Sequence, residues 1–286
     1  MLGVSLIWGT NFSISKLALG HLGPLPFAAM RFVLSSALLV AVFWSVERPG
    51  RIPRSVLWRL LAWGIVGHTF NQGFFLYGLR HTTATNSALI FATLPVVVAL
   101  FGIASGRERP EARVWAGIGL GTLGVVLVVA AQGAHFTVDT LRGDALTIGA
   151  VICWASFLVG VRTVAMSRSS LEVAAITHVG GTPGLVLAAT PGLVAVDLPA
   201  LSPIVWIALI YSAVFSSLVA MVLWTRGLKA LGGSRTALYN CVTPVFAALV
   251  AWLLLGERPT PLQGVGAALV IAGILVSRAP AQAEEV

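Results

Sequence analysis

The chain has 286 residues, of which 57% are hydrophobic and only 10% are charged, and its mean hydropathy is +0.93. A soluble domain has about 25% charged residues, so the composition excludes a soluble globular protein and predicts an all-α membrane protein. A net charge of +8 would favour nucleic acid as the partner of a soluble chain, but in a membrane protein the basic residues mark topology. We therefore expect the lipid bilayer, and no nucleic acid, around this chain.

Ten apolar runs follow one another along the chain, separated by short connectors rich in Gly, Pro and charged residues. A helix that crosses a bilayer needs about 20 mostly apolar residues. In chain order the runs cover residues 2–19, 27–46, 57–79, 83–104, 114–131, 146–164, 173–196, 204–228, 236–255 and 262–276. We therefore expect ten transmembrane helices. The first run has no basic leader and no small-residue cleavage site, so we expect no cleavable signal peptide.

The basic residues orient these predicted helices. With the N-terminus in the cytoplasm, thirteen Arg and Lys residues lie in or beside the cytoplasmic connectors, whereas the outer connectors carry only Arg80, Arg142 and Arg258. Cytoplasmic connectors of membrane proteins carry an excess of basic residues. We therefore expect both termini in the cytoplasm, with residues 279–286 as a cytoplasmic tail.

The chain contains an internal duplication with an offset of 149 residues. The offset carries residues 78–80 (GLR) onto 227–229 (GLK) and residues 108–110 (ERP) onto 257–259 (ERP). It spans five predicted crossings, an odd number, so the two copies have opposite orientations in the membrane. We predict a first five-helix repeat at residues 1–132 and an inverted second repeat at residues 143–278. Inverted repeats are typical of secondary transporters, whose substrate site lies near the bilayer midplane.

Three prolines lie inside the predicted helices. Pro95 and Pro244 are near the middle of the fourth and ninth helices, at equivalent positions of the two repeats, and Pro183 lies in the seventh helix. A proline inside a helix removes a hydrogen bond and kinks the helix. Such kinks are either tolerated packing features, which are common in membrane helices, or hinges that shape a central cavity.

Polar and aromatic residues inside the predicted helices are the candidates for a binding site, because intramembrane polar groups face the bundle interior or a wet cavity. We expect a cavity lined by Trp8, Asn11, His68, Asn71, Gln72, Trp154, His178, Tyr211, Tyr239 and Asn240, with Lys16 and Arg31 as possible contacts for an anion. The alternative for each histidine and for Arg31 is a hydrogen bond to a neighbouring helix. The alternative for the tryptophans is a place at the membrane interface.

All ten acidic residues lie in connectors or in the tail. Proton-coupled carriers commonly place Asp or Glu inside the membrane as a relay, so this distribution argues against a carboxylate-based antiporter of cationic drugs. Neither Cys153 nor Cys241 has the spacing of a metal ligand. We expect no metal, no cofactor and no catalytic residue.

Several motifs are similar to those of a known family. They are residues 6–12 (LIWGTNF), 26–32 (PFAAMRF), 82–88 (TTATNSA) and the region around Pro95 and residues 108–110 with its second copy. Together they resemble EamA-type transporters of the drug/metabolite transporter superfamily, a group that includes bacterial amino-acid exporters. The resemblance covers nearly the whole chain. It implies a bacterial inner-membrane transporter that exports amino acids or related metabolites through a central cavity opening alternately to each side.

The aromatic and amide residues favour a neutral or zwitterionic small-molecule substrate, so we expect export of amino acids with aromatic or apolar side chains by a monomer. One alternative is a carrier of phosphorylated sugars or nucleotide-sugars, which would need more basic residues at the cavity than Lys16 and Arg31. Another alternative is an intramembrane enzyme or a receptor. An enzyme would need a nucleophile–base pair or an acidic metal site, and the predicted helices carry neither, so we expect no enzyme.

Overall fold

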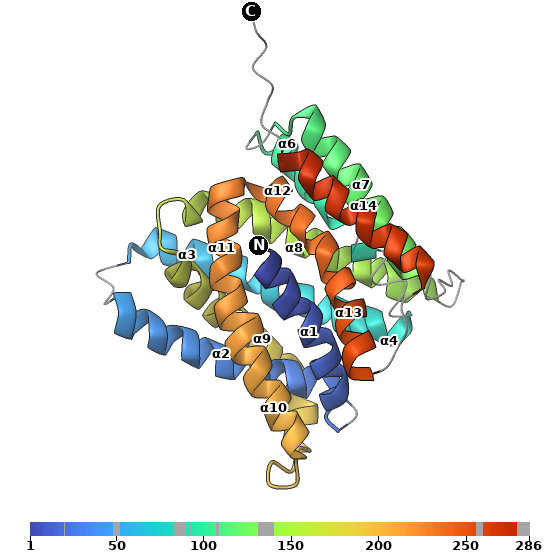
Figure 1. Cartoon of the computed structure of the whole chain (residues 1–286). Helices are drawn as coiled ribbons and strands as arrows, with labels where there is room; N and C mark the ends of the chain where they lie inside the picture. Colours follow the sequence, from blue (N-terminus) through green and yellow to red (C-terminus); the bar gives the residue numbers. More distant parts are fainter. Residues whose placement is uncertain are drawn as a thin grey trace, which may run out of the picture.

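The computed structural model describes residues 1–19, 21–47, 52–82, 90–91, 93–106, 109–130, 140–255 and 260–278. Every regular element in these residues is a helix (Figure 1). The first half contains α1 (Leu2–Leu19), α2 (Pro24–Glu47), α3 (Arg54–Gly64), the π-helix η1 (Ile65–Phe70), α4 (Asn71–His81), α6 (Leu94–Ala104) and α7 (Ala112–Ala130). The second half contains α8 (Leu141–Ala165), α9 (Ser170–Val194), α10 (Pro203–Tyr211), the π-helix η3 (Ser212–Val219), α11 (Ala220–Leu231), α12 (Gly233–Leu238), the 3-10 helix η4 (Tyr239–Val242), α13 (Thr243–Leu255) and α14 (Pro261–Arg278).

The helices lie on the apolar runs of the sequence. The helix α1 has the bounds predicted for the first run, and α7 and α14 cover the fifth and tenth runs. Residues 83–89 of the fourth run lie outside the described part of the chain. Four helical stretches are long and apolar enough to cross a membrane by themselves, namely Pro24–Glu47, Leu141–Ala165, Ser170–Val194 and Pro203–Leu231. The prediction of an all-helical protein with membrane-length apolar helices is therefore confirmed.

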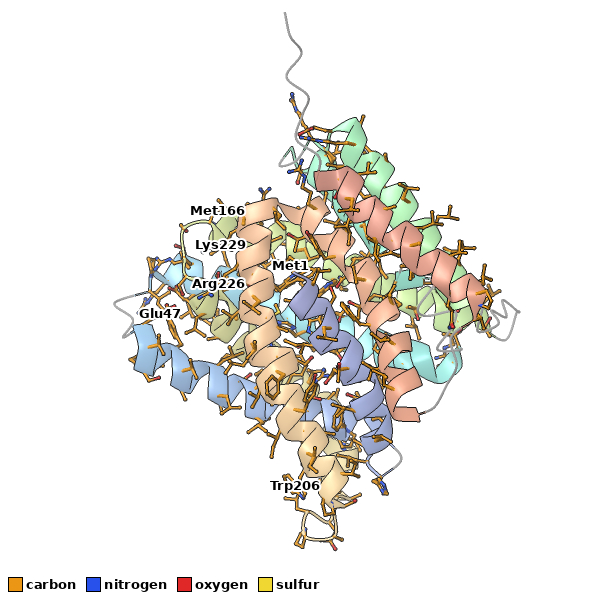
Figure 2. The ribbon with its side chains drawn as sticks, in the orientation of Figure 1. Met1, Glu47, Met166, Trp206, Arg226 and Lys229 are labelled. Atoms are coloured by element: carbon orange, nitrogen blue, oxygen red, sulfur yellow. The ribbon has the colours of Figure 1, made fainter. Side chains whose placement is uncertain are left out.

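Large apolar side chains cover the outside of the bundle. Leu187, Val194 and Leu253 are 75%, 83% and 68% exposed, although a soluble monomer rarely exposes extended apolar patches. Along the helical stretch Pro203–Leu231, Trp206 lies near one end and Arg226 and Lys229 lie near the other (Figure 2). An apolar outer surface between ends that carry polar or aromatic residues suits a bilayer.

Two helical stretches contain a π-helical segment at equivalent positions of the chain. The segment η1 continues from α3 into α4, and η3 continues from α10 into α11, with right-handed helical backbone angles at each junction. Shifted back by 149 residues, positions 212–219 become 63–70, which covers η1. A π-helical turn displaces the backbone hydrogen bonds by one residue and is frequent at functional sites. The internal duplication thus extends to the local backbone.

Pro95 and Pro244 differ in their helical surroundings. Pro95 is the second residue of α6, where a proline removes no hydrogen bond, because the first amides of a helix have no partner within it. Pro244 is the second residue of α13, which follows α12 and the 3-10 segment η4 without a gap, so it lies where one helical stretch changes from 3-10 to α-helical geometry. The roles of the two prolines as kinks or hinges stay predictions. Pro183 does lie inside a helix, α9.

The helices α7 and α14 lie side by side along one edge of the molecule (Figure 1). A Cβ at Gly117 would lie 2.6 Å from the carbonyl oxygen of Gly273, and a Cβ at Gly124 would lie 2.5 Å from that of Gly266. The earlier glycine of α7, Gly117, meets the later glycine of α14, Gly273, so the two helices are antiparallel. Glycines allow the backbones to approach this closely.

The main hydrophobic core lies between α1, α2, α8, α9 and α11. Its fully buried side chains include Leu39, Phe157 and Trp224. Trp8 of α1 and Trp154 of α8 both pack against this one cluster. The core therefore brings together helices from the two halves of the chain, and polar residues on its rim are held between these halves.

Candidate functional site

A cluster of rings forms where η1 packs against α9. The ring centroid of His68 lies 4.5 Å from that of His178, 5.3 Å from those of Phe32 and Phe157, and 6.1 Å from that of Trp154. His68 and His178 are 4% and 2% exposed. The structure therefore brings three of the predicted site residues together inside the bundle.

Glycines determine how closely these rings approach. A Cβ at Gly181 of α9 would lie 2.4 Å from the Cβ of His68, and a Cβ at Gly67 would lie 2.4 Å from the ring of Phe157. Any larger residue at either position would push η1 away from its neighbours. The ring cluster thus depends on Gly67 and Gly181 as much as on the rings themselves.

The two histidines differ in their hydrogen bonds. The Nδ1 atom of His178 lies 3.1 Å from the carbonyl oxygen of Ala174, one turn earlier in α9. The Nε2 atom of His68 is buried and has no hydrogen-bond partner among the described residues. Buried polar atoms in proteins nearly always have a partner, so His68 is the histidine that is available to a ligand. No group of three potential metal-binding side chains gathers in the described part of the chain.

Arg31 of α2 begins a chain of polar contacts beside this cluster. Its Nη2 atom lies 3.5 Å from Oε1 of Gln72, and Nε2 of Gln72 lies 3.5 Å from Oδ1 of Asn71. Asn71 donates a shorter hydrogen bond of 2.9 Å to the carbonyl oxygen of Ala150 in α8. The guanidinium carbon of Arg31 also lies 5.2 Å from the ring centre of Phe32. The 3.5 Å contacts are weak, so Arg31 is held loosely.

The helix α1 holds η3 through a second set of polar contacts. Ser212 donates a hydrogen bond of 2.6 Å to Asn11, and Nε1 of Trp8 donates one of 3.0 Å to the carbonyl oxygen of Ser216. The hydroxyl of Tyr211 lies 3.4 Å from the carbonyl oxygen of Ile7. The ring of Trp8 also packs 5.0 Å from that of Trp224. The predicted residues Trp8, Asn11 and Tyr211 therefore meet at one interface.

The remaining predicted residues lie elsewhere. Tyr239 is 3% exposed and packs in a separate hydrophobic cluster with residues of α7 and α14, and its carbonyl oxygen accepts a hydrogen bond of 2.8 Å from Ser5. Asn240 is half-buried in η4 beside it. The side chain of Lys16 lies outside the described residues. Tyr239 therefore belongs to the packing around α7 and α14 rather than to the ring cluster.

The sequence did not single out several residues that complete these contacts. Phe32 and Phe157 supply rings around His68, and Ser36 of α2 contacts Thr182 of α9 through a hydroxyl–hydroxyl hydrogen bond of 2.7 Å. Phe157 follows Trp154 by three positions, which places both on one face of α8, and Phe32 follows Arg31. These spacings are the signals that would have identified the two phenylalanines.

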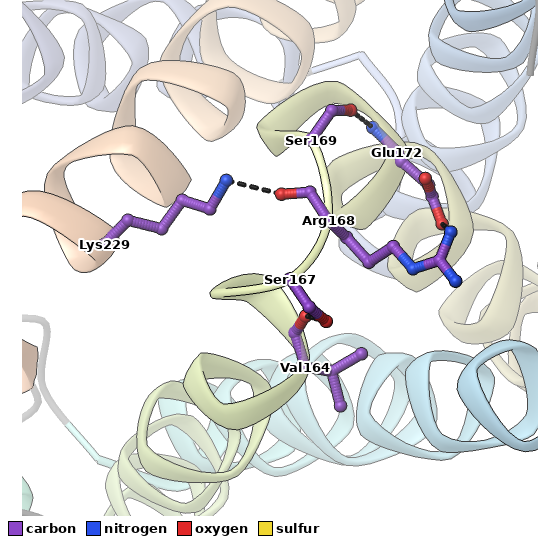
Figure 3. Close-up of polar contacts among 6 residues, drawn as sticks. All are labelled: Val164, Ser167, Arg168, Ser169, Glu172 and Lys229. Carbon is purple, nitrogen blue, oxygen red and sulfur yellow. Dashed lines mark hydrogen bonds and ion pairs between the residues drawn. The ribbon is translucent and has the colours of Figure 1, made fainter.

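Ionic contacts gather at the end of the molecule that carries most basic residues. Lys229 of α11 donates a hydrogen bond to the carbonyl oxygen of Arg168, and Arg168 lies 3.6 Å from Glu172 (Figure 3). Glu111, just before α7, forms ion pairs of 2.6 Å with Arg113 and 3.7 Å with Arg235 of α12. The hydrogen bond from Arg113 holds the pKa of the Glu111 carboxyl below its usual value. Glu111 thereby links the two halves of the chain outside the bundle core.

A bundle of apolar helices with polar contacts in its interior is the architecture of an integral membrane protein that handles a solute within the membrane. A sequence model of the EamA-like transporter family matches residues 1–130 and again residues 141–279. The chain belongs to this family of small-metabolite transporters, whose members are integral membrane proteins. The resemblance seen in the sequence motifs is thereby confirmed.

Similar proteins extend over almost the whole chain. The uncharacterised transporter YyaM of Bacillus subtilis is 28% identical over 97% of this chain and 92% of its own length. A probable amino-acid metabolite efflux pump of Salmonella typhimurium is 26% identical over 96% and 92%. An S-adenosylmethionine/S-adenosylhomocysteine transporter of Chlamydia trachomatis is 23% identical over 90% and 81%. One crystal structure shares the fold, with a TM-score of 0.83, 18% identity and 96% of each chain covered.

Proposed function

We propose that this transporter exports amino acids, including aromatic and apolar ones, across the inner membrane of a bacterium by alternating access. In this proposal ten helices cross the membrane with both termini in the cytoplasm, and the substrate binds between two inverted five-helix repeats. The cavity is lined by the ring cluster and by the α1–η3 interface, and Pro183 lies at a bend of α9. The protein works as a monomer and carries out no chemical step.

Two observations support the inverted arrangement. The family model matches the chain twice, at residues 1–130 and 141–279. In the antiparallel pair α7–α14, Gly117 meets Gly273 while Gly124 meets Gly266. The offset of 149 residues relates Gly117 to Gly266 and Gly124 to Gly273, so each contact is the image of the other. Contacts that map onto each other in this way are those that a two-fold axis generates.

The proposed substrate class rests mainly on Arg31. It is a half-buried cation of α2, about 10 Å along the helix from Pro24 at 1.5 Å per residue, and its buried Nε atom has no hydrogen-bond partner among the described residues. None of the ion pairs formed within the described residues involves Arg31. A cation inside a membrane bundle is costly without a counter-charge. The carboxylate of an amino acid would supply that charge and accept hydrogen bonds from Nε and Nη2 together.

The surroundings of Arg31 suit the rest of such a substrate. The rings of Phe32 and His68 offer apolar faces, and Gln72 and Asn71 offer amide oxygens for an ammonium group. The names of two relatives point the same way. One is a probable amino-acid metabolite efflux pump, and the other is an S-adenosylmethionine/S-adenosylhomocysteine transporter, whose named substrates carry an amino-acid group. A sugar phosphate carries more negative charge and needs more than one cation, whereas Arg31 is the one basic side chain that the described residues place beside the ring cluster.

The proposal is tested by exchange of labelled amino acids in proteoliposomes, with competition by matched compounds. Phenylalanine should compete and phenethylamine, which lacks the carboxylate, should not. The variant Arg31→Gln should lose about 10- to 100-fold in amino-acid flux, which corresponds to one charge-assisted hydrogen-bond pair. The variant Arg59→Gln, which removes an exposed arginine of α3, is the control and should transport normally.

Three results would contradict the proposal. Absence of flux for every amino acid in the panel would remove the substrate class. Equal competition by the amine and the amino acid would remove the role of the carboxylate. Competition by a sugar phosphate in preference to all amino acids would favour the carrier of phosphorylated sugars instead.

A further inference from the structure

A groove of about 380 Å³ lies on the outside of the bundle, between α4, α8 and α9. It is named here the α4 groove. Phe70 and Phe74 line one wall, with ring centroids 6.5 Å apart, and Leu146 and Ala188 line the other. Gly73 lies between the two phenylalanines and has no side chain, so the groove is hollow at its centre. The α4 groove is separate from the ring cluster, where His68 is buried.

The α4 groove opens toward the lipid. Phe70, Phe74 and Tyr77 are 51%, 37% and 45% exposed, and in a membrane protein these rings face acyl chains rather than water. The groove runs along the end of η1 and along α4, from Thr69 to His81, which is twelve residues or about 18 Å at 1.5 Å per residue. The hydrocarbon of one leaflet is about 15 Å thick, half of the bilayer core. The length of the groove therefore matches one leaflet.

One end of the α4 groove is basic. His81, at the end of α4, and Arg142, in the first turn of α8, line this end, and both are exposed. The N-terminal end of α8 adds a partial positive charge beside Arg142. Asp144 lies in the same turn, but it is buried, accepts a hydrogen bond of 2.5 Å from Thr82, and does not line the groove. Tyr77 lies next to the basic end, as aromatic residues do near lipid headgroups.

We propose that the α4 groove binds an anionic phospholipid, with one acyl chain along Phe70 and Phe74 and the phosphate against Arg142 and His81. An apolar channel as long as one leaflet, ending in basic groups at helix ends, complements an acyl chain joined to a phosphate. No carboxylate lines the basic end among the described residues, which favours a lipid with net negative charge over a zwitterionic one. This site is independent of amino-acid transport.

The structure offers a matched pair of variants to test the site. A Cβ at Gly73 would meet no atom within 4 Å, and the same holds for Gly119 in α7. The variant Gly73→Leu places a side chain in the α4 groove from a Cβ that meets no atom, whereas Gly119→Leu places the same side chain on another helix. Arg142→Gln leaves the groove open and removes its charge, so it tests the headgroup contact even if Gly73→Leu were poorly folded.

The measurement is native mass spectrometry of the full-length protein with phosphatidylglycerol or phosphatidylcholine of identical acyl chains. The wild type and Gly119→Leu should retain one phosphatidylglycerol in preference to phosphatidylcholine. Gly73→Leu should retain about tenfold less of either lipid, and Arg142→Gln should lose the preference while still binding phosphatidylcholine; a tenfold change corresponds to about 1.4 kcal/mol.

The proposal is overturned if Gly73→Leu retains as much lipid as Gly119→Leu, or if the wild type binds the two lipids equally. Retention of inorganic phosphate alone, without lipid, would assign the basic end to a free anion and also overturn it. A dimer that Gly73→Leu dissociates would assign the groove to a second copy of the chain.

Discussion

The two π-helical segments share a backbone but differ in what they contact. Position 64, just before η1, and positions 67 and 68 within it are Gly, Gly and His, whereas the equivalent positions 213, 216 and 217 of η3 are Ala, Ser and Ser. Gly64, just before η1, packs against the backbone of α9, and Gly67 of η1 packs against the ring of Phe157. The segment η3 is held to α1 by a hydrogen bond that Ser212 donates to Asn11 and by one that the carbonyl oxygen of Ser216 accepts from Trp8.

The contacts around η1 are therefore tightly packed and apolar, whereas those around η3 are polar. Direct backbone packing leaves no room for water, and parting it exposes apolar surface and cavities. Hydrogen bonds to hydroxyl and amide groups can instead be replaced by water or by a solute at little net cost. We infer that the α1–η3 interface opens more readily than the η1–α9 interface, and the variants below test this difference.

The largest effect is expected at Gly64, where α3 meets α9. A Cβ there would lie 2.1 Å from the carbonyl oxygen of Thr177, so Gly64→Ala must push the two helices apart. We expect Gly64→Ala to lower the free energy of unfolding by about 1–3 kcal/mol, measured as loss of monodisperse protein after heating in detergent. The matched control Gly73→Ala should melt like the wild type, since a Cβ there meets nothing within 4 Å.

The equivalent position in the second half sharpens this test. Ala213 already carries a Cβ, so Ala213→Gly removes a methyl group from η3 rather than adding one. The expected loss is about 1 kcal/mol, the helix-propensity cost of glycine. If Gly64→Ala melts no lower than Ala213→Gly, the junction between α3 and η1 is packed no more tightly than the start of η3.

An intermediate effect is expected at the two tryptophans. Trp8→Phe keeps a ring but removes the hydrogen bond of 3.0 Å to the carbonyl oxygen of Ser216, which should lower the transport rate about 3- to 10-fold for a net loss near 1 kcal/mol. Trp154 stacks 5.1 Å from Phe157, and Trp154→Phe keeps that stacking. We therefore expect Trp154→Phe to transport at close to the wild-type rate, with expression unchanged in both variants.

Proteoliposome flux at equal protein density measures the difference between the tryptophans. Normal flux in Trp8→Phe would make Trp8 a packing residue. A loss in Trp154→Phe equal to that in Trp8→Phe would remove the distinction between the polar interface and the ring cluster.

The smallest effect is expected at Glu111. Its equivalent in the second half is Thr260, which caps α14 by a reciprocal pair of hydrogen bonds with Gln263, whereas Glu111 pairs with Arg113 and Arg235. The pKa of Glu111 lies below the usual value because of Arg113, so the folded state favours the charged form. The contact should thus be complete at neutral pH and be lost as the pH falls through the lowered pKa.

Hydrogen–deuterium exchange of residues 231–238 measures this contact. Glu111→Gln should raise exchange there at neutral pH, and the wild type should reach the same exchange only in acid, below the ordinary pKa of a glutamate. Asp197→Asn, which alters an exposed carboxylate in another connector, should change nothing. If acid raises the exchange of residues 231–238 in Glu111→Gln as much as in the wild type, the pH effect belongs to another group.

The sequence by itself determined the positions of the helices, the duplication and the family. A lipid environment requires long apolar runs with satisfied backbones, and this requirement acts on each run separately, so α1, α7 and α14 could be predicted from composition. The offset that relates η1 to η3 is likewise a property of the linear chain. The motifs around Trp8 and Arg31, together with those at residues 82–88 and 108–110 and with the duplication, indicated the family.

Only the tertiary structure decided which polar residues meet. Trp8 contacts Ser216 across 208 positions, and His68 contacts His178 because glycines at 67 and 181 allow two helices to touch. Tyr239 had the same appearance in the sequence as Tyr211 but faces α7 and α14. Pro95 lies at the start of α6, whereas Pro244 follows η4 within one helical stretch. Such outcomes depend on how each helix is rotated and how closely its neighbours approach, and both are set by steric fit between faces that are distant in sequence.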